Sequence, residues 1–152
     1  IMPRVKKLFV MEKKKKNNNN QLIILYQSLI ESKALYIDDF FKIILENKIK
    51  IIIIEYFITN YSKKHQIIIK DENTNDFFYI NDEYKNQLKS FNKKFFDPYK
   101  RNNKFELEHK KNKIITTVGQ MNFFKWAIEN GIINYIEIHN KEIMVEYYKS
   151  KA

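Results

Sequence analysis

The residues best suited to chemistry gather in one aromatic and basic loop, residues 89–104, which reads KSFNKKFFDPYKRNNK. Its cations are Lys89, Lys93, Lys94, Lys100, Arg101 and Lys104. Its aromatic side chains are Phe91, Phe95, Phe96 and Tyr99. Such cations neutralise phosphates, and an aromatic ring that stacks on a base contributes ~1–3 kcal/mol. Four aromatic side chains within nine residues are costly to leave in water, so this pattern predicts a partner-binding surface. The alternative is an ordinary solvated loop.

Positive charge is concentrated in two segments. The formal net charge is +10, although part of the lysine content follows a bias towards amino acids with A- and T-rich codons. Residues 4–16 carry seven cations and one acid, and residues 89–113 carry nine cations and three acids. The rest of the chain is close to neutral. Two basic patches on a near-neutral body predict binding to a polyanion such as RNA or DNA.

Catalytic and metal-binding patterns are missing from the sequence. Cysteine is absent, the three histidines are far apart, and with only two glycines the chain has no glycine-rich phosphate loop. The acid pairs Asp38-Asp39, Asp71-Glu72 and Asp82-Glu83 lie in polar segments, whereas general acid–base work needs a concave apolar site. We therefore expect no enzyme, no metal, no cofactor and no small-molecule substrate. No apolar run approaches the ~20 residues of a spanning helix, so no membrane partner is expected either.

The first half of the chain predicts a strand, a helix and a second strand behind a flexible arm. Residues 1–20 include KKKKNNNN and are expected to be a basic flexible arm, either RNA-binding or a compositional accident. Residues 21–26 are apolar and of strand length. Apolar residues at three- and four-residue spacing, Ile37, Phe40, Phe41 and Ile44, predict a helix. Residues 48–57, KIKIIIIEYF, are β-branched and aromatic and predict a central strand.

The second half predicts a hairpin-like insertion at about residues 58–88, the extended loop at about 89–104, and then a strand, a helix and a strand. Residues 105–116 resume as one strand or two short ones. Thr117 and Gln120 have the spacing of a capping box, and Asn130-Gly131 ends the helix that follows. Residues 132–139, IINYIEIH, predict the last strand, and residues 140–152 form a C-terminal tail.

This element order predicts a single α+β domain over residues 21–139. Strand, helix, strand, then strand, helix, strand is the order of a ferredoxin-like split βαβ sandwich, in which two helices cover one face of a four-stranded sheet. The loop at residues 89–104 would protrude from it. The uncovered face of the sheet would be open to a partner.

The C-terminal half resembles a known family. Residues 105–111, FELEHKK, are similar to the Phe-Glu-aliphatic strand and His/Lys/Arg cluster that mark small-subunit ribosomal protein ten. An aliphatic pair, a helix containing FFKW as in mitochondrial members, and a glycine-initiated segment at residues 131–138 follow in the family's order. Upstream, residues 88–94 resemble the family's Leu-Arg-Ser and Asn-Lys elements. The sequence departs from the family where residues 116–119 replace the usual Asp-Pro before the second helix.

The resemblance implies a structural constituent of the small-subunit head, binding ribosomal RNA and neighbours such as ribosomal proteins three and fourteen. His109, Lys110, Lys111 and Lys113 are then expected to contact RNA phosphates at the base of the loop, with a solvated hairpin turn as the alternative. A mitochondrial ribosome is the expected location. The competing hypothesis is a free basic nucleic-acid-binding protein of an organellar or viral nucleoid, whose affinity would depend steeply on salt.

Overall fold

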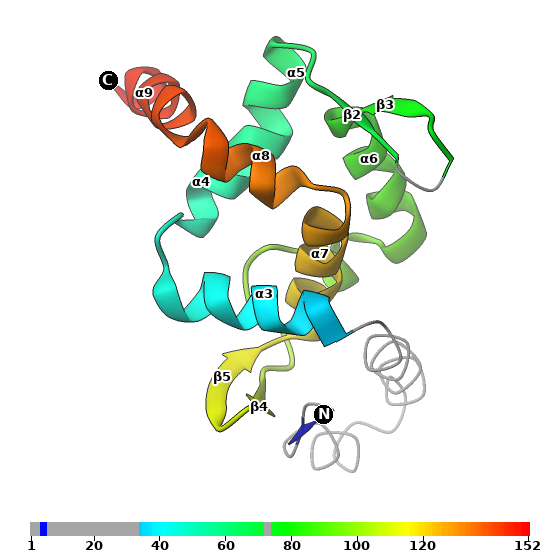
Figure 1. The fold of residues 1–152 in the computed structure, drawn as a ribbon, viewed down its shortest axis with the longest axis vertical. Coiled ribbons are helices and arrows are strands. Elements are labelled where there is room, and N and C mark those ends of the chain that lie inside the picture. The colour runs from blue at the N-terminus through cyan, green and yellow to red at the C-terminus, as the bar shows by residue number, and fades with distance from the viewer. Residues whose placement is uncertain (1–3, 6–33, 72–73) are drawn as a thin grey trace. The chain divides into compact units, whose positions relative to one another are not determined.

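The computed structural model describes residues 4–5, 34–71 and 74–152 (Figure 1). The chain divides into two compact units, one of Ile1–Asn47 with Lys93–Lys125 and the other of Lys48–Asn92 with Trp126–Ala152. The predicted strand at residues 21–26 and most of the predicted arm lie outside the described residues. Two residues of that arm, Arg4 and Val5, form a strand. The single domain over residues 21–139 stays a prediction.

The first unit is built on a small antiparallel sheet. Its elements are β1 (Arg4–Val5), α3 (Ala34–Glu46), the 3-10 turn η2 (Lys93–Phe95), β4 (Phe105–His109), β5 (Asn112–Thr116) and the start of α7 (Val118–Glu129). The strands run in the order β1-β4-β5. Leu107, at the centre of β4, lies opposite Val5 on one side and Ile114 on the other. Strand β4 is therefore the central strand of this sheet.

Helix α3 forms where the apolar spacing predicts it. Tyr36, Ile37, Phe40 and Phe41 recur on one helical face and are all at most 4% exposed. Phe40 packs against Phe124 of α7, with ring centroids 5.4 Å apart. The predicted helix is confirmed, and its apolar face forms much of the core of the first unit.

The second unit is mainly helical. Its elements are α4 (Ile51–Tyr56), the π-helical turn η1 (Phe57–Tyr61), α5 (Ser62–Lys64), β2 (Ile68–Lys70), β3 (Phe77–Tyr79), α6 (Ile80–Phe91), α8 (Ile132–Ile138), α9 (Asn140–Lys151) and the end of α7. Strands β2 and β3 pair as an antiparallel hairpin within the region predicted to be a hairpin-like insertion. Phe77 of this hairpin is 70% exposed.

The central strand predicted at residues 48–57 is wrong, because α4, η1 and α5 form a continuous helical stretch there. Ile53, Ile54, Phe57, Ile58 and Tyr61 are buried. This spacing of one and three residues marks one face of a helix, whereas a strand would bury every second residue. Burial of that face has overridden the β propensity of four consecutive isoleucines.

The closing strand predicted at residues 132–139 is also wrong, because the segment forms α8. Ile132, Ile133 and Ile136 are buried, again at helical spacing. Gly131, with φ of +72°, ends α7 and starts α8 directly. The residues that follow, predicted to be a tail, form α9.

The α+β class is confirmed, since helices and antiparallel strands both occur in the structure. A four-stranded ferredoxin-like sheet is not shown, because the sheets among the described residues have three strands and two. Two of the four expected strands are helices α4 and α8. No helix in the described part of the chain is long and apolar enough to cross a membrane.

Candidate nucleic-acid interface

The predicted aromatic and basic loop is divided between the two units. Lys89 and Phe91 belong to the last turn of α6, and its C-cap residue, Asn92, has φ of +52°. Residues 93–104, called the basic segment below, belong to the first unit. The exposed cations of the basic segment are Lys93, Lys94, Lys100, Arg101 and Lys104. The structure thus brings five of the six predicted loop cations together on one continuous stretch of backbone.

Two aromatic side chains of the basic segment are buried, contrary to the prediction of an exposed aromatic surface. Phe95 is 6% exposed and Phe96 is 1% exposed. Phe96 packs on Phe123 of α7, with ring centroids 5.4 Å apart. Burial of large rings against a helix removes apolar surface from water, so these rings anchor the segment and are not available to stack on bases. Partner binding by Phe91 and Tyr99, both half-buried, stays a prediction.

The first turns of α7 hold the backbone of the basic segment. Asn122 Nδ2 donates to the Phe95 carbonyl at 2.9 Å, and Gln120 Nε2 donates to the Pro98 carbonyl at 2.8 Å. The Asp97 amide donates to the Gly119 carbonyl at 3.2 Å. Asn122 and Gln120 are buried, so their hydrogen bonds are protected from water. The basic segment is therefore braced against α7 at residues 95–98, between Lys94 and Lys100.

Gly119 allows the basic segment to approach the helix closely. A Cβ atom at this position would lie 3.0 Å from the Lys94 carbonyl oxygen and 3.4 Å from the Phe95 carbonyl carbon. Both neighbours are backbone atoms, and the Phe95 carbonyl is itself held by Asn122. Glycine is thus required here by contact and not by an unusual φ.

The predicted capping box is half formed. Thr117 Oγ1 accepts a hydrogen bond from the Gln120 amide at 3.0 Å, which caps α7 as expected. The Gln120 side chain does not complete the box. Its Oε1 accepts from Thr116 Oγ1 at 2.7 Å, and its Nε2 reaches Pro98. The capping spacing predicted the helix start but not the second task of Gln120, which is to hold the basic segment.

The turn between β4 and β5 carries two lysines in a strained conformation. Lys110 and Lys111, called the hairpin tip below, have φ of +48° and +68°. Two-residue hairpin turns of this kind favour Asn-Gly or Gly-Gly, because residues with a Cβ atom are disfavoured at positive φ. Both side chains are exposed. The hairpin tip therefore presents two adjacent cations on a strained backbone.

His109, expected to contact RNA phosphates, is buried in the free protein. Its side chain is 3% exposed, and its Nε2 lies 2.6 Å from Asp38 Oδ1 on α3. Asp38 also lies 3.1 Å from Lys110 Nζ. The hydrogen bond from His109, followed by that from Lys110, lowers the pKa of Asp38 below its ordinary value. In the free protein His109 therefore forms a pair with Asp38 that fixes the hairpin against α3, and RNA contact by His109 stays a prediction.

The charge of the described molecule is uneven. Lys93–Lys125 carries nine cations and three acids, an excess of six positive charges. The two segments of the second unit, residues 48–92 and 126–152, together carry ten cations and ten acids. Lys113 of β5 is exposed and lies 3.7 Å from Glu108, a distance at which the pair contributes little. The basic segment and the hairpin tip can therefore neutralise phosphates, while the second unit has no net charge to add.

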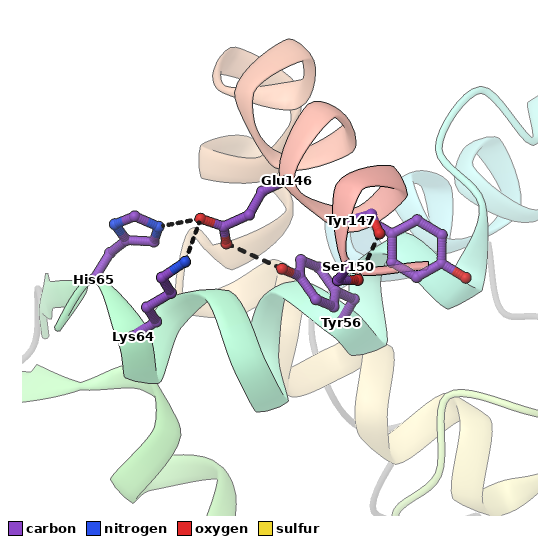
Figure 2. A network of polar contacts seen from close by, with 6 residues as sticks. All are labelled: Tyr56, Lys64, His65, Glu146, Tyr147 and Ser150. Carbon is purple, nitrogen blue, oxygen red and sulfur yellow. Dashed lines mark hydrogen bonds and ion pairs between the residues drawn. The ribbon is translucent and has the colours of Figure 1, made fainter. Parts of the chain in front are cut away.

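A polar network in the second unit ties α9 to α4 and α5 (Figure 2). Glu146 Oε1 lies 2.8 Å from His65 Nε2 and 3.3 Å from Lys64 Nζ, and Oε2 accepts from Tyr56 at 3.0 Å. Partial burial raises the pKa of Glu146, but hydrogen bonds from His65, Tyr56 and Lys64 together hold it below its ordinary value. Among the described residues, no cluster of His, Asp and Glu is suited to a metal ion. We interpret the network as structural.

Sequence reasoning missed the residues that position the interface. In the sequence Asp38 belongs to an acid pair in a polar segment, and Gln120 has only the spacing of a helix cap. Gly119 is one of only two glycines, but its sequence position does not predict a close contact with Lys94 and Phe95, and Asn122 has no signal that distinguishes it from other polar residues. Their roles depend on contacts with residues more than twenty positions away, which no local pattern encodes.

Comparison with known proteins gives a family and a viral relative. The family model described as a family of unknown function, DUF7197, matches residues 5–151. The uncharacterized protein L507 of Acanthamoeba polyphaga mimivirus is 42% identical over 106 residues, which are 64% of this chain and 41% of the relative. This chain therefore spans about two fifths of that relative's length. No solved structure matches. Nothing in these matches indicates a ribosomal protein.

Proposed function

We propose that this chain, which belongs to the DUF7197 family, binds the phosphate backbone of duplex nucleic acid with little sequence preference. The observation that carries the proposal is the excess of six positive charges on Lys93–Lys125, where five of the nine cations lie on the basic segment. Counterion release from the duplex makes such contacts favourable at low salt. Lysine is suited to this role because it acts as a point charge and reads no base pattern.

The fixed backbone of the basic segment supports the proposal. A flexible loop would have to lose conformational entropy when its cations align with phosphates. Here Asn122 and Gln120 have already fixed the backbone at Phe95 and Pro98, so that less entropy is lost on binding. The relatedness to a mimivirus protein is consistent with a protein that handles viral nucleic acid.

A ribosomal constituent is the second candidate. What supports it is the order of β4, β5 and α7, which follows the order that the resemblance to ribosomal protein ten expects. This candidate requires a four-stranded ferredoxin-like sheet containing β4 and β5, and α8 stands where its closing strand is expected. It predicts co-sedimentation with the small subunit, and a protein found only in ribosome-free fractions would exclude it.

The test of backbone binding is a salt titration with a short fluorescein-labelled duplex, followed by anisotropy. The variant Lys100→Ala with Lys104→Ala removes two exposed cations from the basic segment. If both contact phosphates, the slope of log K against log salt concentration becomes shallower by roughly 1.8, because each lost contact to B-form DNA removes about 0.9. A scrambled duplex should give the same affinity and slope as the original.

The matched control is Lys63→Ala with Lys85→Ala, which removes the same charge from exposed positions of the second unit. This control should leave the slope close to that of the wild type. Equal changes in the two double variants would mean that only net charge matters, and the proposed interface would be wrong. Failure of the wild-type chain to bind any duplex at low salt would refute the proposed function itself.

A further inference from the structure

The carboxylate of Asp38 bridges two nitrogen donors at the base of the hairpin tip. Oδ1 lies 2.6 Å from His109 Nε2 and 3.1 Å from Lys110 Nζ, and Oδ2 lies 3.3 Å from the same Nζ. An anion with two oxygens therefore already sits between a buried imidazole and an exposed ammonium group. A phosphodiester also presents two unesterified oxygens that share one negative charge.

His109 is arranged as a fixed hydrogen-bond donor. Its Nδ1 is buried and has no hydrogen-bond partner among the described residues. A buried N–H without an acceptor is costly, so the neutral ring carries its proton on Nε2, where the carboxylate accepts it. The ring also packs on Phe41, with centroids 5.4 Å apart. This donor stays in place whether its acceptor is a carboxylate or another anion.

Asp38 differs from His109 in being free to leave. Its side chain is 41% exposed, whereas that of His109 is 3% exposed. Its ion pair with Lys110, whose side chain is 55% exposed, contributes little net stability, since water solvates both of these partners when they separate. A phosphate that replaces Asp38 would also replace it as the acceptor for His109. Rotation of the Asp38 side chain into solvent would leave the two donors facing an accessible position.

We propose that His109 Nε2 and Lys110 Nζ form a phosphate-binding site that Asp38 occupies in the free protein and a backbone phosphate occupies in the complex. This inference rests on the proposed function. Lys111, next to Lys110 at the strained hairpin tip, supplies a second cation at this position. The strain has a function under this proposal, because Asn-Gly would make the same turn with no cation.

Asp38 then acts as an internal competitor of the phosphate. In the wild type, a phosphate that binds at this site replaces the Asp38 carboxylate as the partner of Lys110. Lys110 therefore adds little to the salt dependence of duplex binding. Asp38→Asn removes the carboxylate that pairs with Lys110, and one further phosphate contact makes the slope of log K against log salt steeper by about 0.9. Extrapolated from 1 M to 0.1 M salt, that slope corresponds to roughly eightfold tighter binding.

The experiment compares Asp38→Asn with Asp39→Asn by salt-dependent anisotropy on the same duplex. Asp39 is exposed, lies on the same helix and changes the net charge equally. We expect the steeper slope only in Asp38→Asn, its loss in Asp38→Asn with Lys110→Ala, and its retention in Asp38→Asn with Lys85→Ala. Equal slopes in Asp38→Asn and Asp39→Asn would overturn the proposal, because only long-range charge would then be acting.

A measurement on the wild type covers the case in which Asp38→Asn does not fold. Imidazole nitrogen resonances are followed by NMR while duplex is added. The His109 Nε2 resonance should shift on saturation, whereas those of His65 and His139, in the second unit, should not. An unchanged His109 in a chain that binds duplex would exclude the site but leave the proposed function standing.

Discussion

Replacing Gln120 by alanine tests whether α7 braces the basic segment. The change removes the donor that reaches the Pro98 carbonyl at 2.8 Å and the acceptor used by Thr116 at 2.7 Å. Pro98 and Thr116 are both buried, so the carbonyl loses a protected donor, while the hydroxyl keeps a weak contact with the Thr117 carbonyl at 3.4 Å. One orphaned buried acceptor and one lost hydrogen bond should lower the free energy of unfolding by about 2–4 kcal/mol.

The assay is urea unfolding followed by circular dichroism, with Gln87→Ala as the matched control. Gln87 is also helical and donates a side-chain hydrogen bond, to Glu83 at 3.1 Å, but it is only half-buried. Its loss should cost about 0.5 kcal/mol or less. If Gln120→Ala costs no more than the control, the bracing argument is refuted. The variant should also bind duplex more weakly than Gln87→Ala, because its cations are no longer held in fixed positions.

Three further changes have defined outcomes. Gly131→Ala should cost about 1 kcal/mol in urea unfolding because φ is +72°, while no atom of the described residues lies within 4 Å of the added Cβ; Gly131→Asn should cost less. The pKa of Asp38 is lowered in the fold, so its pairing with His109 stabilises the protein at pH values above the ordinary pKa of 3.8. This stabilisation is lost as the pH falls through the folded pKa. Asp38→Asn should therefore make the free energy of unfolding depend less on pH in this acid range. Tyr56→Phe should cost about 0.5–1.5 kcal/mol by removing the 3.0 Å hydrogen bond to Glu146, visible as a lower urea midpoint at unchanged slope.

Local patterns in the sequence predicted the elements whose burial follows one simple period. Phe40 and Phe41 mark the buried stripe of α3, and Thr117 marks the start of α7, whose end at Gly131 needs a positive φ. Each of these signals is contained within one turn or a few turns of chain. They are physical requirements of the element itself and hold wherever it packs.

The isoleucine run at residues 51–54 predicts a strand wrongly, because its residue types favour a strand while the spacing of the buried residues around it is helical. Ile51 to Ile54 have high β propensity, but the run is too short to show a period without its neighbours. Extending the window to Phe57, Ile58 and Tyr61 reveals the helical spacing that the structure buries. Side-chain packing contributes more free energy than the intrinsic preference of the backbone, so propensity is the weaker signal at such positions.

The candidate interface shows the same division between local and distant information. Its cations could be predicted, because a basic patch is a property of composition. Whether those cations lie on a mobile loop or on a braced segment depends on three residues of α7. Gln120 and Asn122 donate hydrogen bonds to the backbone of the segment, and Gly119 allows that backbone to approach the helix. The hairpin tip depends in the same way on Asp38, far upstream on α3. The affinity of the surface for phosphate is therefore controlled by neutral and acidic side chains that a search for basic residues passes over.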